Sequence, residues 1–112
     1  MKSNYYDKEG KSMDLTEWAR SSENKKYKHV ADDYLEKCRV STVWLGLNHN
    51  FYDGPPLIFE TMVFRASNGK VTDWGELDMD RYSTLKQAKN GHKKMVKRWK
   101  KKQHEDTKVK MS

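Results

Sequence analysis

The sequence predicts an α+β fold: a small antiparallel β-sheet of three to five strands, with a C-terminal helix packed on one face and a short N-terminal helix at its edge. Three observations predict it. Two runs of β-branched and aromatic residues, 39–47 and 57–64, flank a segment rich in turn residues. Apolar residues recur at helical spacing after Thr84, and a helix-capping pattern begins at Asp14.

The length of 112 residues predicts one domain, because two halves would each bury too little apolar surface. We assign it to residues 1–104 and expect residues 105–112 to form a disordered tail. A lone cysteine, Cys38, excludes an intramolecular disulfide and favours a reducing cytoplasm. No apolar run is long enough to span a bilayer, and the first ten residues lack the apolar core of a signal peptide. We therefore expect a cytoplasmic protein with no membrane partner.

The N-terminal part of the chain predicts three short elements. Residues 5–13 pair aromatic residues with a glycine-containing break and are typical of a short hairpin or an extended arm. Asp14 is an expected N-cap, with Glu17 three residues later, for a helix from Leu15 to about Ser22. Polar residues then lead into a strand with mixed faces, within residues 27–36.

The middle of the chain predicts a hairpin and a further strand. Residues 39–47 and 57–64 should pair antiparallel, and the second run is apolar on both faces, as a central strand is. The turn sequence at 67–70 then returns the chain into an edge strand at 74–82. Alternation along that edge strand predicts one shared face for three of its residues: Leu77, Met79 and Arg81.

The last helix carries the clearest pattern. Thr84 and Gln87 form a capping-box pair. The apolar stripe that follows predicts packing on the sheet, and consists of Leu85, Ala88, His92, Met95, Val96 and Trp99. Gly91 borders this stripe and indicates a close approach of helix to sheet. His92 lies on it and is expected to be a packed, hydrogen-bonded core residue rather than a ligand.

The positive charge is concentrated at this end of the chain. Residues 1–82 carry 12 Lys/Arg and 14 Asp/Glu, whereas residues 83–112 carry 11 and 2. Between Lys86 and Lys102 there are nine basic residues, eight of them lysine, and no acid. Such a local excess indicates an acidic partner such as nucleic acid, although a solvated face kept for solubility is the plain alternative.

Charge repulsion within the helix is the expected cost of this pattern. Five like-charged pairs fall at i,i+4 and together cost about 1 to 2.5 kcal/mol at low salt: Lys89/Lys93, Lys93/Lys97, Lys97/Lys101, Lys94/Arg98 and Arg98/Lys102. If the helix ends near residue 102, its dipole offsets part of this cost for residues 98–102. The acids at 73–80 could supply internal partners instead.

No metal or catalytic motif is present. The four histidines are scattered and Cys38 stands alone, so we expect no metal site and no cofactor. Glu60 interrupts an apolar strand and needs a partner, for which Arg39, Arg65 and Arg81 are available; a structural pair is favoured over catalysis. An enzyme built around His49 and Glu60 is the least favoured hypothesis.

Aromatic side chains offer a second kind of contact. Six of them could include stacking platforms beside the basic helix, as single-strand binders require: Tyr27, Tyr34, Trp44, Phe51, Tyr52 and Trp74. Trp44 is expected in the core. Phe51 and Tyr52 precede Gly54, Pro55 and Pro56 in a turn that resists deep burial, so both are candidates for contact with a protein.

Three blocks read together, STVWLGLNHNF, GPPLIFETMVF and DRYSTLKQAKNGHKKMV, resemble a family of small, mostly uncharacterised proteins encoded by bacteriophages and related bacterial genomes. The resemblance covers about residues 39–99. It implies no assigned activity, cofactor or catalytic residue. What it implies is a setting, since small phage accessory proteins often bind a host or phage macromolecule, sometimes to block a defence system.

The leading hypothesis is a non-enzymatic phage accessory protein that binds a polyanionic target, either nucleic acid or an acidic host protein or nucleoprotein. The residues predicted to bind it are Lys89, Lys93, Lys97, Arg98 and Lys101. The alternative is an inhibitor of a host or defence protein that uses the loop at 48–56. Because lysine dominates over arginine, nucleic-acid binding should read phosphates rather than bases.

Overall fold

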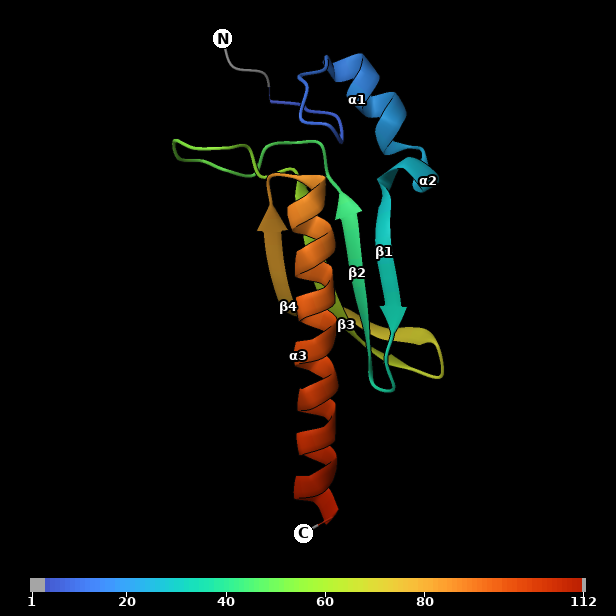
Figure 1. The fold of residues 1–112 in the computed structure, drawn as a ribbon. Coiled ribbons are helices and arrows are strands. Elements are labelled where there is room, and N and C mark those ends of the chain that lie inside the picture. Colours follow the sequence, from blue (N-terminus) through green and yellow to red (C-terminus); the bar gives the residue numbers. More distant parts are fainter. Residues whose placement is uncertain (1–3, 112) are drawn as a thin grey trace.

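The computed structural model describes residues 4–111, and side chains through residue 103. It contains a four-stranded antiparallel sheet, one long C-terminal helix and two short N-terminal helices (Figure 1). The helices are α1 (Leu15–Ser22), α2 (Lys25–Lys28) and α3 (Leu85–Met111). The strands are β1 (His29–Tyr34), β2 (Cys38–Trp44), β3 (Phe59–Ser67) and β4 (Lys70–Tyr82). The predicted α+β class is confirmed.

The sheet is a meander in which the strands follow chain order, β1-β2-β3-β4, so that β3 is central as expected. The β3–β4 turn places Asn68 and Gly69 at φ values of 53° and 73°. Two successive residues with positive φ match the right-handed twist of a hairpin, and Asn-Gly tolerates this conformation best. β2 ends at Trp44, before Gly46 turns the chain with φ 73°. The observed strand therefore ends at Trp44, earlier than the strand predicted at 39–47.

Local signals at the N-terminus act as predicted. The carboxylate of Asp14 accepts a hydrogen bond from the amide of Glu17 at 2.8 Å and caps α1. Before it, Tyr6 and Ser12 form an antiparallel bridge, so residues 5–13 make the short hairpin. α1 and α2 lie beyond the end of the sheet at which β1 begins (Figure 1).

The core lies between the sheet and α3. Alternation along β2 directs Val40, Thr42 and Trp44 toward the helix, and all three are fully buried. From α3 the most buried stripe residues are Ala88, His92 and Met95. Leu85, Val96 and Trp99 pack partly buried at the edges of the same core, so the predicted stripe is confirmed.

The prediction that Leu77, Met79 and Arg81 of β4 share one face of the sheet is wrong for Leu77. Met79 pairs with Met62 and Arg81 with Glu60 on the sheet face away from α3, but Leu77 packs instead against the core beneath α3. The cause is a bulge, because the register moves from Asp78 opposite Val63 to Glu76 opposite Phe64. An extra residue in one strand shifts the alternation, so Leu77 leaves the face that period-two spacing assigned to it.

Candidate nucleic-acid interface

The cationic surface is positioned by the packing of α3. Thr84 Oγ1 accepts a hydrogen bond from the amide of Gln87, and the Gln87 side chain accepts one from the amide of Thr84, so the helix begins with a complete capping box. With the apolar stripe buried, the opposite side of the helix faces solvent. The predicted binding residues are all exposed: Lys89, Lys93, Lys97, Arg98 and Lys101. At about 1.5 Å rise per residue, Lys89 and Lys101 lie about 18 Å apart.

Within the described side chains, the four lysines of this set have no carboxylate partner. Within residues 4–103, none of them lies within 4 Å of a carboxylate oxygen. The acids at 73–80 therefore pair with neither Lys97 nor Lys101. We call the four residues Lys89, Lys93, Lys97 and Lys101 the lysine face.

Arg98 differs from the lysine face. Its Nη1 donates to Asp78 Oδ2 at 2.9 Å, and Trp99 Nε1 donates to the same oxygen at 3.0 Å. Burial acts to raise the pKa of Asp78, but these hydrogen bonds together outweigh it and hold the pKa below its ordinary value. Asp78 is thus an ionised internal partner, and it neutralises Arg98 in part.

The observed length of α3 changes the charge balance expected from the sequence. The helix continues to Met111, so residues 98–102 lie more than two turns before its end. The favourable interaction of cations with the helix dipole falls off within the last turn. The dipole therefore does not offset the repulsion among these residues. Residues 105–112 were predicted to form a disordered tail. Residues 105–111 belong to α3, and residue 112 lies outside the described residues. The disorder of this tail stays a prediction.

Lys8 adds a fifth lysine near the start of the lysine face. Its Nζ donates to the carbonyl of His29 at 3.2 Å. Partial burial lowers the pKa of Lys8; the nearby Glu9 carboxylate opposes this, and the charge of Lys89 lowers the pKa further. The interaction shows that the N-terminal hairpin brings positive charge next to α3.

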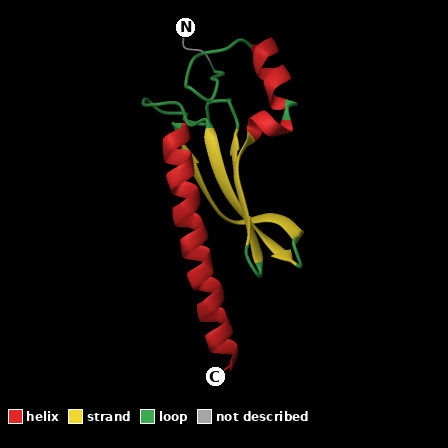
Figure 2. Ribbon diagram, turned by 45° about the vertical axis from the view of Figure 1, so that its right-hand side comes forward, coloured by secondary structure: helices red, strands yellow, loops and turns green. Residues whose placement is uncertain are grey.

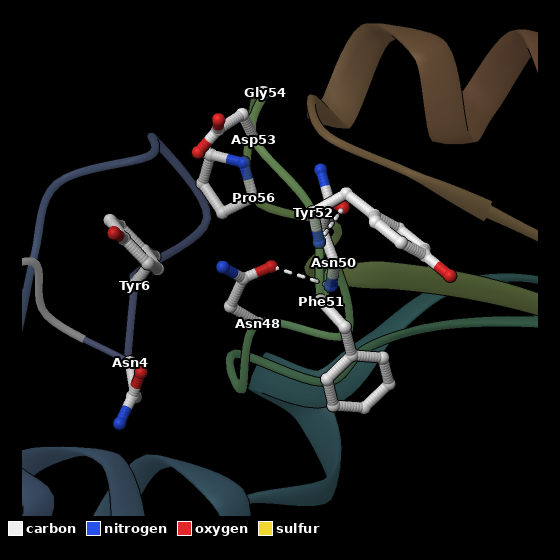
Figure 3. Close-up of a pocket in the computed structure, with 9 residues that line it drawn as sticks. All are labelled: Asn4, Tyr6, Asn48, Asn50, Phe51, Tyr52, Asp53, Gly54 and Pro56. Atoms are coloured by element: carbon white, nitrogen blue, oxygen red, sulfur yellow. Dashed lines mark hydrogen bonds between the residues drawn. The ribbon is translucent and has the colours of Figure 1, made fainter.

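The loop at 48–56 is ordered by two asparagines. Asn48 Oδ1 accepts from the amides of Asn50 at 2.8 Å and Leu57 at 3.0 Å, and Asn50 Oδ1 accepts from the amide of Tyr52 at 3.0 Å. Phe51 and Tyr52 are 87% and 88% exposed. The loop and the N-terminal residues line a pocket (Figure 3). In Figure 3, Phe51 and Tyr52 lie on the side of this pocket opposite Asn4 and Tyr6, and their rings point away from those two residues. The lining residues are Asn4, Tyr6, Asn48, Asn50, Phe51, Tyr52, Asp53, Gly54 and Pro56.

Glu60 has the structural partner that its buried position requires. Arg81 Nε donates to Glu60 Oε2 at 3.0 Å, which confirms one of the three expected pairings. His49 lies near this pair: partial burial lowers the pKa of His49, the Arg81 charge lowers it further, and the Glu60 charge opposes both. Neither His49 nor Glu60 lines the pocket beside the loop.

His92 joins the helix to the sheet through a chain of hydrogen bonds. Its Nε2 lies 2.7 Å from Asp33 Oδ2, and its Nδ1 lies 2.7 Å from Thr42 Oγ1, which in turn lies 2.5 Å from Thr61 Oγ1. The order Asp-His-Thr resembles a nucleophile activated by a base. However, the Thr42 side chain is fully buried and no substrate can reach it. His92 is the packed core residue that its position in the stripe predicted.

The aromatic residues divide between core and surface. Trp44 is buried, and its ring contacts that of Tyr27 edge to face. Tyr34 and Trp74 are exposed, but they lie on the sheet face away from α3 rather than beside it. Their neighbours on that face, Arg39 and Phe64, were not identified from the sequence. The signal that finds them is strand register, which places residues distant in sequence side by side.

Comparison of the chain with protein-family models, with curated proteins and with solved structures finds no match. The family resemblance of the three sequence blocks stays a prediction. In the described part of the chain, no helix is both long enough and apolar enough to cross a membrane.

Proposed function

We propose that this protein binds a polyanion, nucleic acid or nucleoprotein, through the lysine face of α3, with Arg98 as a weaker contributor. One observation carries the proposal: four exposed lysines follow one side of a single helix, and within residues 4–103 no carboxylate neutralises any of them. About 18 Å of helix is long enough to contact several phosphates.

Self-repulsion supports an external partner over a face kept only for solubility. The five like-charged pairs cost about 1 to 2.5 kcal/mol at low salt. Among the side chains of residues 4–103, Arg98 is the only member of these pairs with a carboxylate partner, and the helix dipole does not act on them because α3 extends to Met111. A polyanion bound along the face relieves the repulsion while releasing its own counterions.

The residue types on the face indicate how it reads its target. Lysine supplies a single mobile charge, whereas base recognition in the major groove relies on the bidentate fork of arginine. The one arginine of the set is held by Asp78. Binding should therefore depend on backbone charge and discriminate little among sequences.

The salt dependence of binding tests this proposal. If about four phosphates are contacted, the logarithm of the association constant for duplex DNA should fall with the logarithm of salt concentration at a slope of about −3 to −4. The double variant Lys97→Gln/Lys101→Gln should weaken binding about 10-fold or more and reduce the slope by about 2. Fluorescence anisotropy with a labelled duplex measures both quantities.

Two variants serve as controls. Lys25→Gln/Lys26→Gln removes the same charge from exposed lysines of α2 and should leave the slope unchanged. Asp78→Asn releases Arg98 from its ion pair, so the salt dependence of DNA binding by this variant should steepen by about 1. No binding at about 50 mM salt would remove the proposal. Equal losses of DNA affinity in the α2 and α3 variants would also remove it, because the effect would then depend on net charge alone.

The setting included in this proposal is the one that the sequence resemblance implies, a non-enzymatic bacteriophage accessory protein in the host cytoplasm.

A second candidate function, inhibition of a host or defence protein through the loop at 48–56, is favoured by one observation. Phe51 and Tyr52 project from an ordered loop at almost full exposure. Aromatic side chains presented on a rigid support are frequent energetic centres of protein interfaces.

The two functions separate in one capture experiment from host lysate treated with nuclease. If the loop binds a protein, Tyr52→Ala should lose that protein while Lys97→Gln/Lys101→Gln retains it. Alanine substitution of a central aromatic residue in an interface typically costs 2 kcal/mol or more, about 30-fold in affinity. Retention of every captured protein by Tyr52→Ala would eliminate the loop as the interface.

A further inference from the structure

β4, with 13 residues, is the longest of the four strands, and it lies at one end of the sheet. Within the described residues it pairs with β3 on one side and with no strand on the other. α3 contacts all four strands and therefore packs on a face of the sheet rather than along this edge (Figure 2). A long free edge presents amides and carbonyls with which a strand of another molecule can pair.

Backbone hydrogen bonds show which amides of β4 point toward its free edge. The carbonyl of Tyr82 accepts from the amide of Ile58, the residue before β3, at 2.9 Å. In an antiparallel strand the N–H and C=O of one residue point to the same side, and the side alternates along the strand. Tyr82 therefore faces the β3 side, and the amides of Arg81 and Met79 point outward.

Aspartate side chains occupy these outward amides. The amide of Arg81 donates to Asp80 Oδ1 at 2.9 Å, and the amide of Met79 donates to Asp78 Oδ1 at 2.9 Å. Both acceptors belong to β4 itself. The carbonyl oxygens of an added strand would need the same two donors, so the side chains already fill the positions that such a strand requires.

The other half of β4 has a related arrangement. Its register with β3 is irregular between Val63 and Ala66, and within this bulged part Asp73 Oδ1 accepts from the amide of Gly75 at 2.9 Å. A bulge bends and twists an edge, which also opposes pairing with another strand. The opposite edge strand, β1, has only six residues and is a shorter template. Protection is therefore concentrated where the edge is longest.

We propose that Asp73, Asp78 and Asp80 close the free edge of β4 and prevent a second copy of this chain from adding its own β4 there. Every copy carries the same 13-residue edge, so two exposed edges could pair about a two-fold axis. The carboxylates oppose this by occupying the outward amides. Asp78 is held in place by Arg98 and Trp99, which donate to its other oxygen. This role is independent of polyanion binding by α3.

Sedimentation velocity of two double variants tests the role of these hydrogen bonds. Asp73→Ala/Asp80→Ala removes two acceptors and two charges, whereas Asp73→Asn/Asp80→Asn removes the same charges and keeps an accepting oxygen at each position. Asp78 is left unchanged because it also bonds Arg98. The alanine variant should dimerise with an association constant about 10- to 100-fold above that of the wild type. The asparagine variant should behave as the wild type does.

Amide hydrogen exchange measured by NMR locates the contact between copies. In a dilute sample of the alanine variant, the Arg81 amide should exchange about 10-fold faster than in the wild type, because its acceptor is gone. At concentrations at which this variant dimerises, the same amide should become protected again. The asparagine variant should keep wild-type exchange at both concentrations.

Three results would overturn this inference. The first is equal association of the alanine and asparagine variants, which would assign the effect to lost charge. The second is an alanine variant that associates no more than the wild type. The third is a dimer in which the Arg81 amide still exchanges fast, because the copies would then meet elsewhere. These measurements contain no nucleic acid, so their failure would leave the proposal for the lysine face unaffected.

Discussion

Replacing His92 with alanine should lower the free energy of unfolding by about 3 kcal/mol. The imidazole is 4% exposed and fills the space between α3 and the sheet. Its removal leaves a cavity and deletes two hydrogen bonds, to Asp33 and Thr42. Because the whole domain is stabilised by only about 5 to 15 kcal/mol, this is a large fraction.

Urea denaturation followed by circular dichroism measures the change. The matched control is Asp33→Asn, which alters the same chain of hydrogen bonds at its solvent end, where the side chain is 54% exposed. That variant should lose less than about 1 kcal/mol. Below its melting temperature, His92→Ala should keep the duplex affinity of the wild type. An unchanged unfolding midpoint would contradict the structural role assigned to His92.

The chain of hydrogen bonds through His92 includes three partner groups: Asp33, Thr42 and Thr61. A carboxylate only accepts, so Nε2–H of His92 donates to Asp33. Nδ1 shares a hydrogen bond with the Thr42 hydroxyl, which shares another with the Thr61 hydroxyl. Both buried hydroxyls are satisfied. The same reasoning identifies the chain as an internal support for α3, because every donor in it is already used.

Elements set by neighbouring residues could be predicted from the sequence. The cap at Asp14, the turn at Asn68 and Gly69, and the capping box at Thr84 each depend on contacts within four residues. The position of His92 in the core followed from helical periodicity for the same reason. Short-range patterns of this kind appear in the sequence because the residues involved are neighbours in it.

Features set by pairing between distant residues could not be predicted. The bulge that turns Leu77 inward depends on the register of two strands, which no local pattern records. The pairing of Arg98 with Asp78 joins residues 20 apart across α3 and β4. The sequence indicated both a basic helix and a set of acids before it, but only the fold decides that Asp78 pairs with Arg98 and that none of these acids pairs with the lysine face.

The candidate surfaces follow the same division. Exposure of the lysine face was predictable, since helical spacing separates it from the apolar stripe. The exposed aromatic residues were only half predictable: Tyr34 and Trp74 were candidates by residue type, but their place on the far side of the sheet from α3 required the strand register.

Gly91→Ala should destabilise the protein by about 2 kcal/mol, although alanine is the better helix former by about 1 kcal/mol. A Cβ added at Gly91 would overlap the Tyr82 ring, so the helix would have to move away from β4. Tyr82 has little room to yield, because it is only 9% exposed and packs within the core cluster of Trp44 and Phe59. The predicted close approach of helix and sheet at Gly91 is confirmed by this contact.

A double-mutant cycle with Tyr82→Leu separates packing from helix propensity. Without the ring, the alanine Cβ meets free space, and Gly91→Ala should then stabilise the helix by up to about 1 kcal/mol. The sign of the effect should therefore reverse between the two backgrounds, with a coupling energy of about 1 to 3 kcal/mol measured by urea denaturation. If Gly91→Ala is equally destabilising in both, the contact with Tyr82 is not the cause. If it stabilises the wild type, α3 can shift away from β4 without loss, and the lysine face is less rigidly positioned than the packing of Gly91 implies.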